Sequence, residues 1–476
     1  MTRTQREIWR SLLDHGIELI RFGRLVGPLE RELEQMERWD PDRIHDWQVS
    51  RLRAILDHCT RRVPYYRDLF RRIGFDPERV NSALDLQVLP ALTKDIIRRH
   101  ASDLFAEGIS PSGIKAGKTG GSTGEPTPYY FSREESAYIH ATFRRCFAWV
   151  GARWGDRLLK IGAASTASSH SLRTSFVKWI SESVQNIFSL PVPSFDETSM
   201  DECLRTVERI EPAILYAYPA ALEMIARRMV QTGFRLPSVR VLWTSSETLF
   251  PHQRETIRQA FGLEVFDGYG TGDAPIAMEC SAHQGLHVFQ HAKLIEVVDG
   301  DGREVRPGQM GRVLITQLHN FAWPCIRYDT GDIAERMAED RECACGVRLP
   351  RFRRILGRIG DTLVTPDGRV IPAGAIPYFN VFGVIANKVR CYQIYQDQKD
   401  HVVMRIVRAD GYDQAAEDHM RGEMSSILGS SVRIDFEYVD DIPLTRSRKR
   451  RLVVSALPAS DLPFDLGAST ENLEES

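Results

Sequence analysis

The chain has 476 residues, of which 42% are hydrophobic and 26% are charged, with a formal net charge of −2. That length exceeds what one compact core accommodates, so we expect two or more domains. The near-neutral charge gives no electrostatic reason to expect a nucleic-acid partner, and no apolar run is long enough to span a bilayer. The N-terminal region lacks the uninterrupted apolar stretch of a signal peptide, which predicts a cytoplasmic protein.

The first part of the chain, to about residue 110, is predicted to be mainly helical, because apolar residues recur at i, i+3 and i+4 in 47–63 and 65–75. From residue 155 onward, short apolar runs alternate with amphipathic stretches. That alternation predicts α/β organisation with largely parallel strands. We expect strands in DRLLKIGAA, AILYAY, VRVLWTSSE and LEVFDGYG. We expect helices in ALEMIARRMVQTG and PHQRETIRQAFG.

Residues 285–335 change character. Runs at 285–305 and 310–320 read as strands, the first of them containing a DGDG turn, which predicts a small β-rich subdomain.

A domain boundary is predicted near residues 357–361. After it, strand-like runs at 402–411 and 432–443 flank a helical stretch at 417–428, which predicts a compact α+β domain. The final residues, 459–476, are acidic and small and are predicted to be disordered.

The stretch AGKTGGSTGEPTP, residues 116–128, contains two candidate phosphate loops. A Walker loop ending in Gly117-Lys118 requires glycine at position 112, where Ser112 stands. The run that follows supplies glycines, whose backbone N–H groups can face an anion, and hydroxyl donors. It comprises Thr119, Gly120, Gly121, Ser122, Thr123 and Gly124. By itself such a run is more often a flexible surface loop.

Four motifs in fixed order make the chain resemble the adenylate-forming enzymes, the acyl-CoA synthetases and their relatives. TGGSTGEPTP resembles their phosphate loop, and VFDGYGTGD (265–273) their aromatic-Gly-x-x-acid segment. CIRYDTGD (325–332) resembles their Tyr-x-Thr-Gly-Asp segment, and IPLTRSRKRRLVVS (442–455) the loop carrying their catalytic lysine. HCTRRVPYYRDLF, LPALTKDII and GRVLITQLHNFAWPCIRYDTGD are similar to the branch containing phenylacetate–coenzyme A ligases and capsule-biosynthesis relatives. The resemblance covers roughly residues 45 to 456.

The resemblance implies an α/β fold with a large N-terminal adenylate-forming domain, residues 1–357. That domain would contain parallel sheets, a helical extension at 1–45 and the β-rich subdomain at about 285–335. A small mobile α+β lid, residues 358–458, would carry the catalytic lysine. Relatives place Asp-Asp at the hinge, where this chain has Gly360-Asp361.

The activity implied is ATP-dependent conversion of a carboxylic acid to an acyl-adenylate with release of pyrophosphate, followed by transfer to coenzyme A. The acceptor could instead be a carrier-protein thiol or an amine. A non-catalytic nucleotide-binding relative is an alternative, because Asp273, Gly360 and Arg448 depart from the family pattern. RNA binding by the RSRKRR run is a third, weaker alternative. The sequence does not fix the oligomeric state, and a homodimer is one alternative.

By resemblance, residues 119–124 bind the β- and γ-phosphates of ATP. Asp273 holds Mg²⁺, although relatives usually have Glu there. Lys449 stabilises charge at the α-phosphate and carboxylate as their bond forms. The Thr445-x-Ser447-x-Lys449 spacing selects this lysine among its basic neighbours.

The same resemblance assigns the rest of the nucleotide. Tyr269 lies against the adenine, followed by Gly270 and Thr271, and Asp332 accepts hydrogen bonds from the ribose hydroxyls. Arg358 is the expected second ribose or phosphate contact. The adenine-pocket loop comprises Ser245, Ser246 and Glu247.

Two close ligand pairs suggest a structural zinc site: Cys280-x-x-His283 and Cys343-x-Cys345. Four nitrogen and sulfur ligands suit tetrahedral Zn²⁺, and members of this branch carry comparable positions. His287 and His291 are alternatives to His283.

The acid is favoured to be aromatic. In relatives the region around residues 130 to 150 lines the acyl pocket, and here it offers several aromatic side chains. They are Tyr138, His140, Phe143, Phe147 and Trp149. The same spacing is typical of an ordinary helix core.

Overall fold

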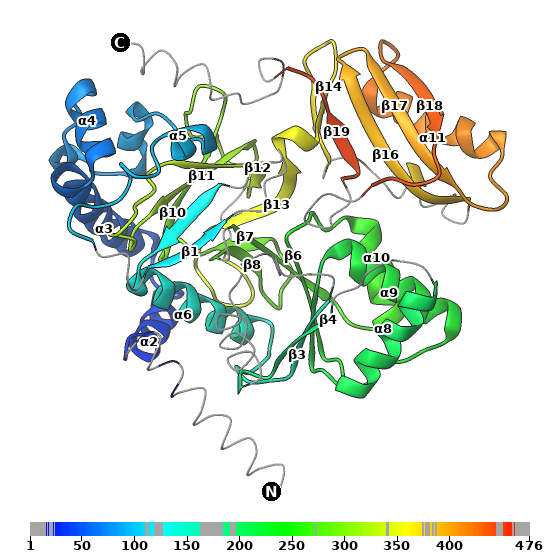
Figure 1. Ribbon diagram of the computed structural model, residues 1–476, viewed down its shortest axis with the longest axis horizontal. Helices are drawn as coiled ribbons and strands as arrows, with labels where there is room; N and C mark the ends of the chain where they lie inside the picture. The colour runs from blue at the N-terminus through cyan, green and yellow to red at the C-terminus, as the bar shows by residue number, and fades with distance from the viewer. Residues whose placement is uncertain are drawn as a thin grey trace, which may run out of the picture.

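The computed structural model describes residues 16, 18, 22, 24–109, 114–118, 127–161, 184–190, 197–271, 274–338, 342–373, 376, 381–382, 385, 388–443, 451–458 and 461. The predicted phosphate loop 119–124, Asp273 and Lys449 lie outside these residues, as does the predicted tail apart from Asp461. The described chain contains a large mixed sheet with helices on both faces and a separate four-stranded sheet (Figure 1). The predicted α/β class is confirmed.

A helical layer comes first, as predicted. It comprises α2 (Val26–Met36), α3 (Pro41–Arg62), α4 (Pro64–Ile73), the 3-10 turns η1 (Pro77–Arg79) and η2 (Ala83–Val88), and α5 (Lys94–Arg99). Helix α3 starts where the Asp40 carboxylate accepts the Arg43 N–H at 2.9 Å. Helix α4 ends at Gly74, whose φ of 65° is accessible to glycine at little cost. The apolar faces of α3, α4 and α5 share one core with Trp323.

Half of the large sheet is parallel, in the order β4-β3-β5-β6-β7. These strands are β3 (Leu158–Ile161), β4 (Ile187–Leu190), β5 (Ile214–Ala217), β6 (Val241–Ser245) and β7 (Val265–Thr271). The four predicted strands are β3, β5, β6 and β7. Parallel strands covered on both faces need continuous apolar runs, and such runs are visible in sequence.

Helices α8 (Glu197–Ile210), α9 (Pro219–Thr232) and α10 (Pro251–Phe261) cover one face of the parallel half, and α6 (Arg133–Trp149) covers the other (Figure 1). Successive side chains of a strand point to opposite faces. Leu242 of β6 therefore packs in the core beneath α9 with Ile225, while its neighbour Trp243 packs against Phe147 of α6. Both predicted helices, α9 and α10, are present.

The other half of the sheet is antiparallel. It contains β8 (Ala274–Glu279), β9 (Leu286–Val288), β10 (Lys293–Val298), β11 (Met310–Gln317), β12 (Tyr328–Arg336) and β13 (Arg351–Arg358). The strands predicted at 285–305 and 310–320 thus continue the large sheet and do not form one of their own. The expected turn is present, with the Gly302 N–H donating to the Asp299 carbonyl at 3.1 Å.

The second sheet lies towards the C-terminus, in the order β18-β17-β16-β19. It comprises β16 (Val389–Gln398), β17 (His401–Arg408), β18 (Arg433–Tyr438) and β19 (Val453–Ser455), with α11 (Gln414–Leu428) packed on it. The turn η3 (Ile359–Asp361) and the hairpin of β14 (Thr362–Val364) and β15 (Val370–Pro372) lead into it. Both predicted strands and the predicted helix are present. The exact boundary and the mobility of this part remain predictions.

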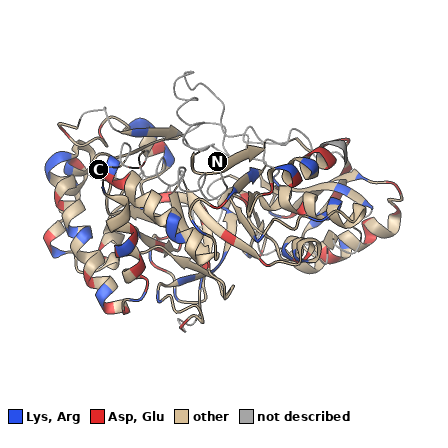
Figure 2. Cartoon of the chain, turned by 90° about the horizontal axis from the view of Figure 1, so that it is seen from below, with Lys and Arg blue, Asp and Glu red and all other residues tan. Residues whose placement is uncertain are grey.

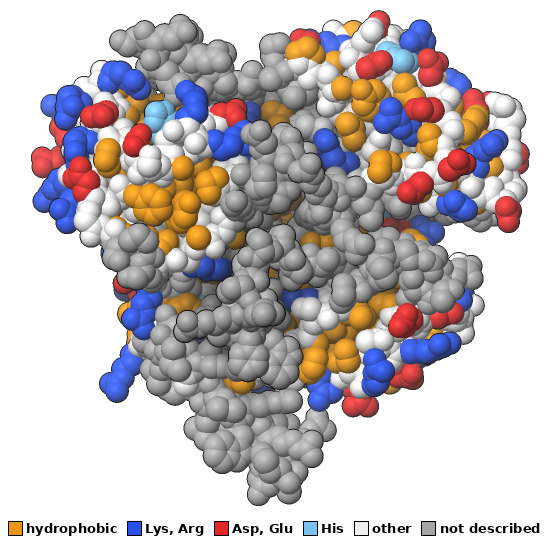
Figure 3. All heavy atoms as spheres, in the orientation of Figure 1, with side chains coloured by type: hydrophobic (Ala, Val, Ile, Leu, Met, Phe, Trp, Pro, Cys, Tyr) orange, Lys and Arg blue, Asp and Glu red, His pale blue; other side chains and the backbone are white. Residues whose placement is uncertain are grey.

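The described surface carries charges of both signs. Basic and acidic residues are interspersed along the helices (Figure 2), and hydrophobic side chains on the face seen in Figure 3 gather between charged ones. Among the described helices, none combines the length and hydropathy that crossing a bilayer requires.

Candidate nucleotide site and cysteine cluster

The predicted phosphate loop connects the two strands of a hairpin. β1 (Lys115–Lys118) and β2 (Pro128–Phe131) pair antiparallel, with Gly117 opposite Tyr129. The Tyr129 ring occupies the space that a Cβ at Gly117 would need. Gly117 is therefore a packing residue of a strand, which agrees with the rejection of a Walker loop.

The carboxyl ends of β5, β6 and β7 meet at one edge of the sheet, where ligands bind in open α/β sheets. The predicted adenine loop leaves β6 here. Ser245 pairs with Gly268, and Ser246 adopts a φ of 72°. A non-glycine residue in this left-handed region costs about 1–3 kcal/mol, and such strain clusters at functional sites.

Tyr269, Asp332 and Arg358, the residues predicted to contact adenine and ribose, lie close together. The Tyr269 hydroxyl donates to Asp332 Oδ2 at 2.9 Å. Asp332 of β12 pairs in register with Arg358 of β13, and Arg358 Nε lies 3.4 Å from Asp332 Oδ1. Burial and the Asp332 carboxylate raise the pKa of Tyr269 well above its usual range. The phenol therefore stays a neutral donor to the carboxylate.

The turn Asp329 to Asp332 is held by its own hydrogen bonds. Asp329 accepts the Gly331 N–H at 2.8 Å and is paired with Arg312, whose Nε lies 2.8 Å from Asp329 Oδ1. The Thr330 hydroxyl oxygen accepts the Asp332 N–H at 3.0 Å. Asp329 is thus committed to the fold, while the Asp332 side chain contacts Tyr269 and Arg358.

Lys94 is a residue of this site that motif analysis missed. Its Nζ lies 3.5 Å from the position that a Cβ would take at Gly331. Burial and the neighbouring Arg358 lower the pKa of Lys94, opposed by Asp332 and Asp329. The lysine belongs to LPALTKDII, which the sequence singled out only as a branch signature.

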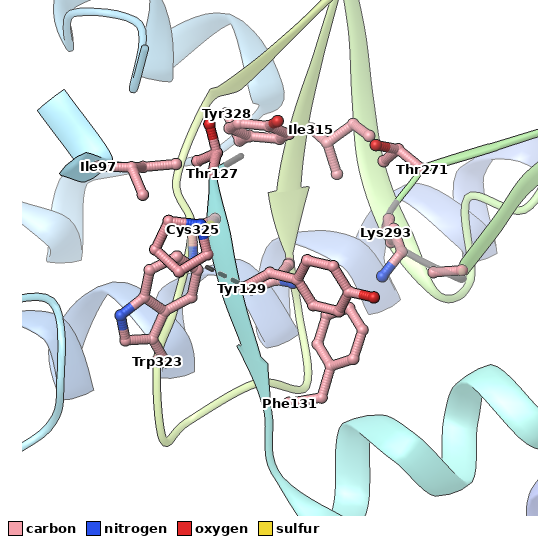
Figure 4. Close-up of a pocket in the computed structure, with 13 residues that line it drawn as sticks. Ile97, Thr127, Tyr129, Phe131, Thr271, Lys293, Ile315, Trp323, Cys325 and Tyr328 are labelled. Carbon is pink, nitrogen blue, oxygen red and sulfur yellow. Dashed lines mark hydrogen bonds between the residues drawn. The ribbon is translucent and has the colours of Figure 1, made fainter. Parts of the chain in front are cut away.

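A cavity is lined by residues that follow the predicted phosphate loop and by residues that flank Gly272-Asp273 (Figure 4). Thr127 follows the predicted phosphate loop, Thr271 and Ala274 flank the predicted magnesium ligand, and Tyr328 opens the Tyr-x-Thr-Gly-Asp segment. Lys293 also lines the cavity and forms a buried ion pair with Glu135 at 2.6 Å. The rest of the lining is mainly apolar: Ile97, Pro128, Tyr129, Phe131, Ile315, Gln317, Trp323 and Cys325.

The aromatic side chains proposed for the acid mostly pack against other rings. Tyr138 stacks on His319, His140 on Phe22, and Trp149 on Phe289, with centroids 3.5, 5.1 and 4.8 Å apart. Phe147 and Phe143 instead approach Trp243 of β6 at 5.8 and 6.4 Å. Only this last pair adjoins the strand that ends in the adenine loop.

Three cysteines and a histidine converge beside β9. The ligand atoms of Cys280, His287, Cys343 and Cys345 all lie within 4.8 Å of one another. The sulfur atoms of Cys280 and Cys343 are 3.6 Å apart, and His287 Nε2 lies 3.4 Å from the Cys345 sulfur. His287 Nδ1 lies 3.0 Å from the Leu349 carbonyl and can donate to it. That bond leaves Nε2 with a lone pair facing the sulfurs.

The set fits tetrahedral zinc. With Zn–S bonds of about 2.3 Å, two thiolates on one ion lie about 3.7 Å apart. Burial lowers the pKa of His287 to about 4, so the imidazole is neutral and able to bind metal at neutral pH.

The prediction of His283 as the fourth ligand is wrong. Its Nδ1 lies 3.1 Å from Glu279 Oε2, and its ring packs on Phe266. Cys280 and His283 share a turn, in which the His283 N–H donates to the Cys280 carbonyl at 3.0 Å. His287 takes the place because β9 pairs with both β8 and β13.

Two family profiles match the chain. The AMP-binding enzyme profile matches residues 119–322, and the CapK C-terminal domain profile matches residues 363–456.

Several known proteins are similar to most of the chain. A phenylacetate-coenzyme A ligase of Thermus thermophilus is 25% identical, over 72% of this chain and 75% of that protein. Protein CapK of Staphylococcus aureus is 20% identical, over 87% and 89%. The structure of a 2-hydroxyisobutyryl-CoA ligase in the postadenylation state matches with a TM-score of 0.71 at 21% identity, over 93% and 94%. The same ligase in its thioesterification state gives 0.58, at 20% identity and the same coverage.

Proposed function

The chain belongs to the adenylate-forming superfamily, in the branch of the phenylacetate–coenzyme A ligases and CapK, and on this premise we propose that it is an acid–thiol ligase. It couples a carboxylic acid to AMP, releases pyrophosphate and then transfers the acyl group to coenzyme A. The AMP-binding profile and the ligase relatives support this reaction.

One structural observation carries the proposal. A single cavity is lined by Thr127, Thr271, Ala274 and Tyr328. These residues adjoin three motifs that are far apart in sequence: the phosphate loop, the acidic segment and the Tyr-x-Thr-Gly-Asp segment. Their convergence supports one ligand shared by the three motifs.

The described residues would bind and orient the nucleotide. The Asp332 carboxylate has the capacity to accept from two ribose hydroxyls while it also accepts from Tyr269. Arg358 offers a planar cation beside that carboxylate. Holding ATP and acid in one geometry lowers the entropic part of the barrier, and fixed positive charge favours reaction between two anions.

Phosphate-loop residues 119–124, Asp273 and Lys449 are assigned by resemblance. Mg²⁺ held through Asp273 would neutralise phosphate charge and orient the phosphate chain. Lys449 would offer its ammonium to the α-phosphate and the acid carboxylate. The C-terminal part would bring Lys449 to the site, and different TM-scores against two states of one ligase are compatible with such a movement.

A structural zinc ion is the second cofactor we propose, bound by Cys280, His287, Cys343 and Cys345. Four protein ligands leave no position for water, so the ion would stabilise the junction of β8, β9 and β13 without taking part in the reaction.

For the acid we propose an aromatic carboxylate. Trp243 is surrounded by Tyr216, Phe143 and Phe147, and it precedes the adenine loop on the same strand. These rings would offer an apolar aromatic surface one strand away from Tyr269.

The reaction is tested by trapping acyl-adenylate with hydroxylamine, using ATP, Mg²⁺ and a panel of aromatic and aliphatic acids without coenzyme A. We expect hydroxamate and pyrophosphate with one class of acid, and loss of both in Lys449→Ala. Lys388→Ala is the matched control, because Lys388 pairs with Asp413 on the C-terminal part. Equal activity in the Lys449 and Lys388 variants would contradict the role of Lys449.

A further inference from the structure

The segment before helix α5 is attached to the strand that carries the ribose acid. The Leu92 N–H donates to the Arg327 carbonyl at 2.9 Å, and the Asp329 N–H donates to the Leu92 carbonyl at 3.1 Å. Together they form a parallel bridge between Leu92 and Tyr328. The Thr93 hydroxyl then caps α5 by accepting the Ile96 N–H at 3.3 Å. The position of Lys94 is therefore fixed by the bridge at Leu92 before it and by the first turn of α5 after it.

This attachment puts the Lys94 ammonium over the turn that precedes Asp332. Gly331 has a φ of 76°, and a Cβ there would lie 3.5 Å from Lys94 Nζ. Ile97, one turn further along α5, lines the cavity between the phosphate loop and Tyr328. Lys94 and the cavity thus lie on the same side of the helix.

Lys94 lies among charges of both signs. Arg358, Asp332, Asp329 and Arg312 act on it electrostatically. Arg312 and Asp329 form a close pair of their own. Asp332 lies beside Arg358 and accepts a hydrogen bond from Tyr269. Both carboxylates are therefore already engaged by groups other than Lys94.

The Lys94 side chain is half-buried and forms no ion pair among the described residues, so its ammonium is available to an anionic ligand. We propose that Lys94 binds a phosphate group of the nucleotide whose ribose is held by Asp332. The inference rests on the proposed function, because it needs a nucleotide at Asp332. Lys94 would make the helical N-terminal part of the chain a direct contributor to the nucleotide site. Its contact is with substrate phosphate and is distinct from that of Lys449, which comes from the C-terminal part.

The proposal is tested by calorimetric titration of the full chain with ATP, AMP and adenosine. Lys94→Met removes the charge at similar volume, and Lys94→Arg keeps the charge. Arg99→Met is the matched control, because it removes a cation from the exposed end of the same helix. Loss of a charge-assisted hydrogen bond predicts roughly 10- to 100-fold weaker ATP and AMP binding in Lys94→Met. Adenosine binding should be unchanged, and Lys94→Arg should recover part of the loss.

Each other result has a definite meaning. If Lys94→Met weakens adenosine as much as AMP, Lys94 positions Asp332 and the phosphate contact is wrong. If Lys94→Met binds AMP like the wild type, the proposal is also wrong. If the wild-type chain binds none of the three ligands, the proposed function itself fails, because Asp332 then holds no ribose.

Discussion

Arg327 provides the sharpest test of how the site is held together. Its guanidinium lies inside the protein, with the side chain 2% exposed, and faces Glu296, which is 3% exposed. Nε donates to Glu296 Oε1 at 3.1 Å, and the terminal nitrogens donate to the carbonyls of Leu89 and Gly302 at 2.5 and 2.7 Å. One side chain therefore joins β10, the DGDG turn and the segment leading to Lys94.

Substitution Arg327→Met keeps most of the volume but removes every one of these donors. Glu296 would be left as a buried carboxylate without its cation, a change that costs about 3–5 kcal/mol of unfolding free energy. Arg79→Met should change the unfolding free energy by less than about 0.5 kcal/mol, because Arg79 is 87% exposed.

Urea unfolding followed by tryptophan fluorescence measures both variants. Burial already raises the pKa of Glu296, and loss of Arg327 would raise it further. A raised folded-state pKa destabilises the charged form, so the loss in Arg327→Met should be larger at about pH 8 than at about pH 5.5. A loss equal to that of Arg79→Met, at either pH, would refute this account of the buried pair.

Four further predictions concern the site and its surroundings. In titration calorimetry, Asp332→Asn should weaken adenosine binding roughly tenfold but should change the binding of 2′,3′-dideoxyadenosine little, because only adenosine offers the two ribose hydroxyls. An equal loss of affinity for both ligands would contradict the ribose contact. Purified protein should contain about one zinc per chain by elemental analysis. The His287→Ala variant should lose the zinc, and the His283→Ala variant should retain it. Loss of zinc in His283→Ala alone would support His283 as the fourth ligand. Gly268→Ala should lower the free energy of unfolding by about 1–3 kcal/mol in urea unfolding, because a Cβ there would lie 2.7 Å from Trp243 Nε1. A free energy of unfolding equal to that of the wild type would show that the indole moves aside. Burial lowers the pKa values of His291 and His319 to about 3. The free energy of unfolding should therefore decrease as the pH falls below 6.5, by up to about 1.4 kcal/mol per pH unit for each histidine. A free energy of unfolding that does not change with pH in urea unfolding would count against neutral buried histidines.

The parts of the fold that could be predicted are those whose signal is local. Strands β5 and β6 appear as short apolar runs because both of their faces are covered, and α10 is bounded by Pro251 and Gly262. The motif containing Asp332 was recognisable since its residues are neighbours in sequence.

Features set by long-range pairing could not be predicted. A strand's own residues do not reveal its partners, so residues 285–335 read as a subdomain instead of the antiparallel half of the large sheet. His283 was favoured over His287 on spacing alone, whereas the register of β9 against β8 and β13 selects His287. Lys94 lies close to Gly331 because a long-range bridge between Leu92 and Tyr328 attaches its segment to β12.

Aromatic spacing in α6 was ambiguous for a related reason. Tyr138 and Trp149 face His319 and Phe289, which come from distant parts of the chain. A helical periodicity shows which residues share a face but not whether that face meets a ligand or a core.

The most direct test of adenylation is acid-dependent exchange of labelled pyrophosphate into ATP, measured in the absence of coenzyme A. Reversible formation of an acyl-adenylate predicts exchange that requires one class of carboxylic acid and Mg²⁺ and that falls in Asp332→Asn. ATP binding without exchange, for every acid in a broad panel, would contradict the proposed adenylation and favour a nucleotide-binding protein without ligase activity.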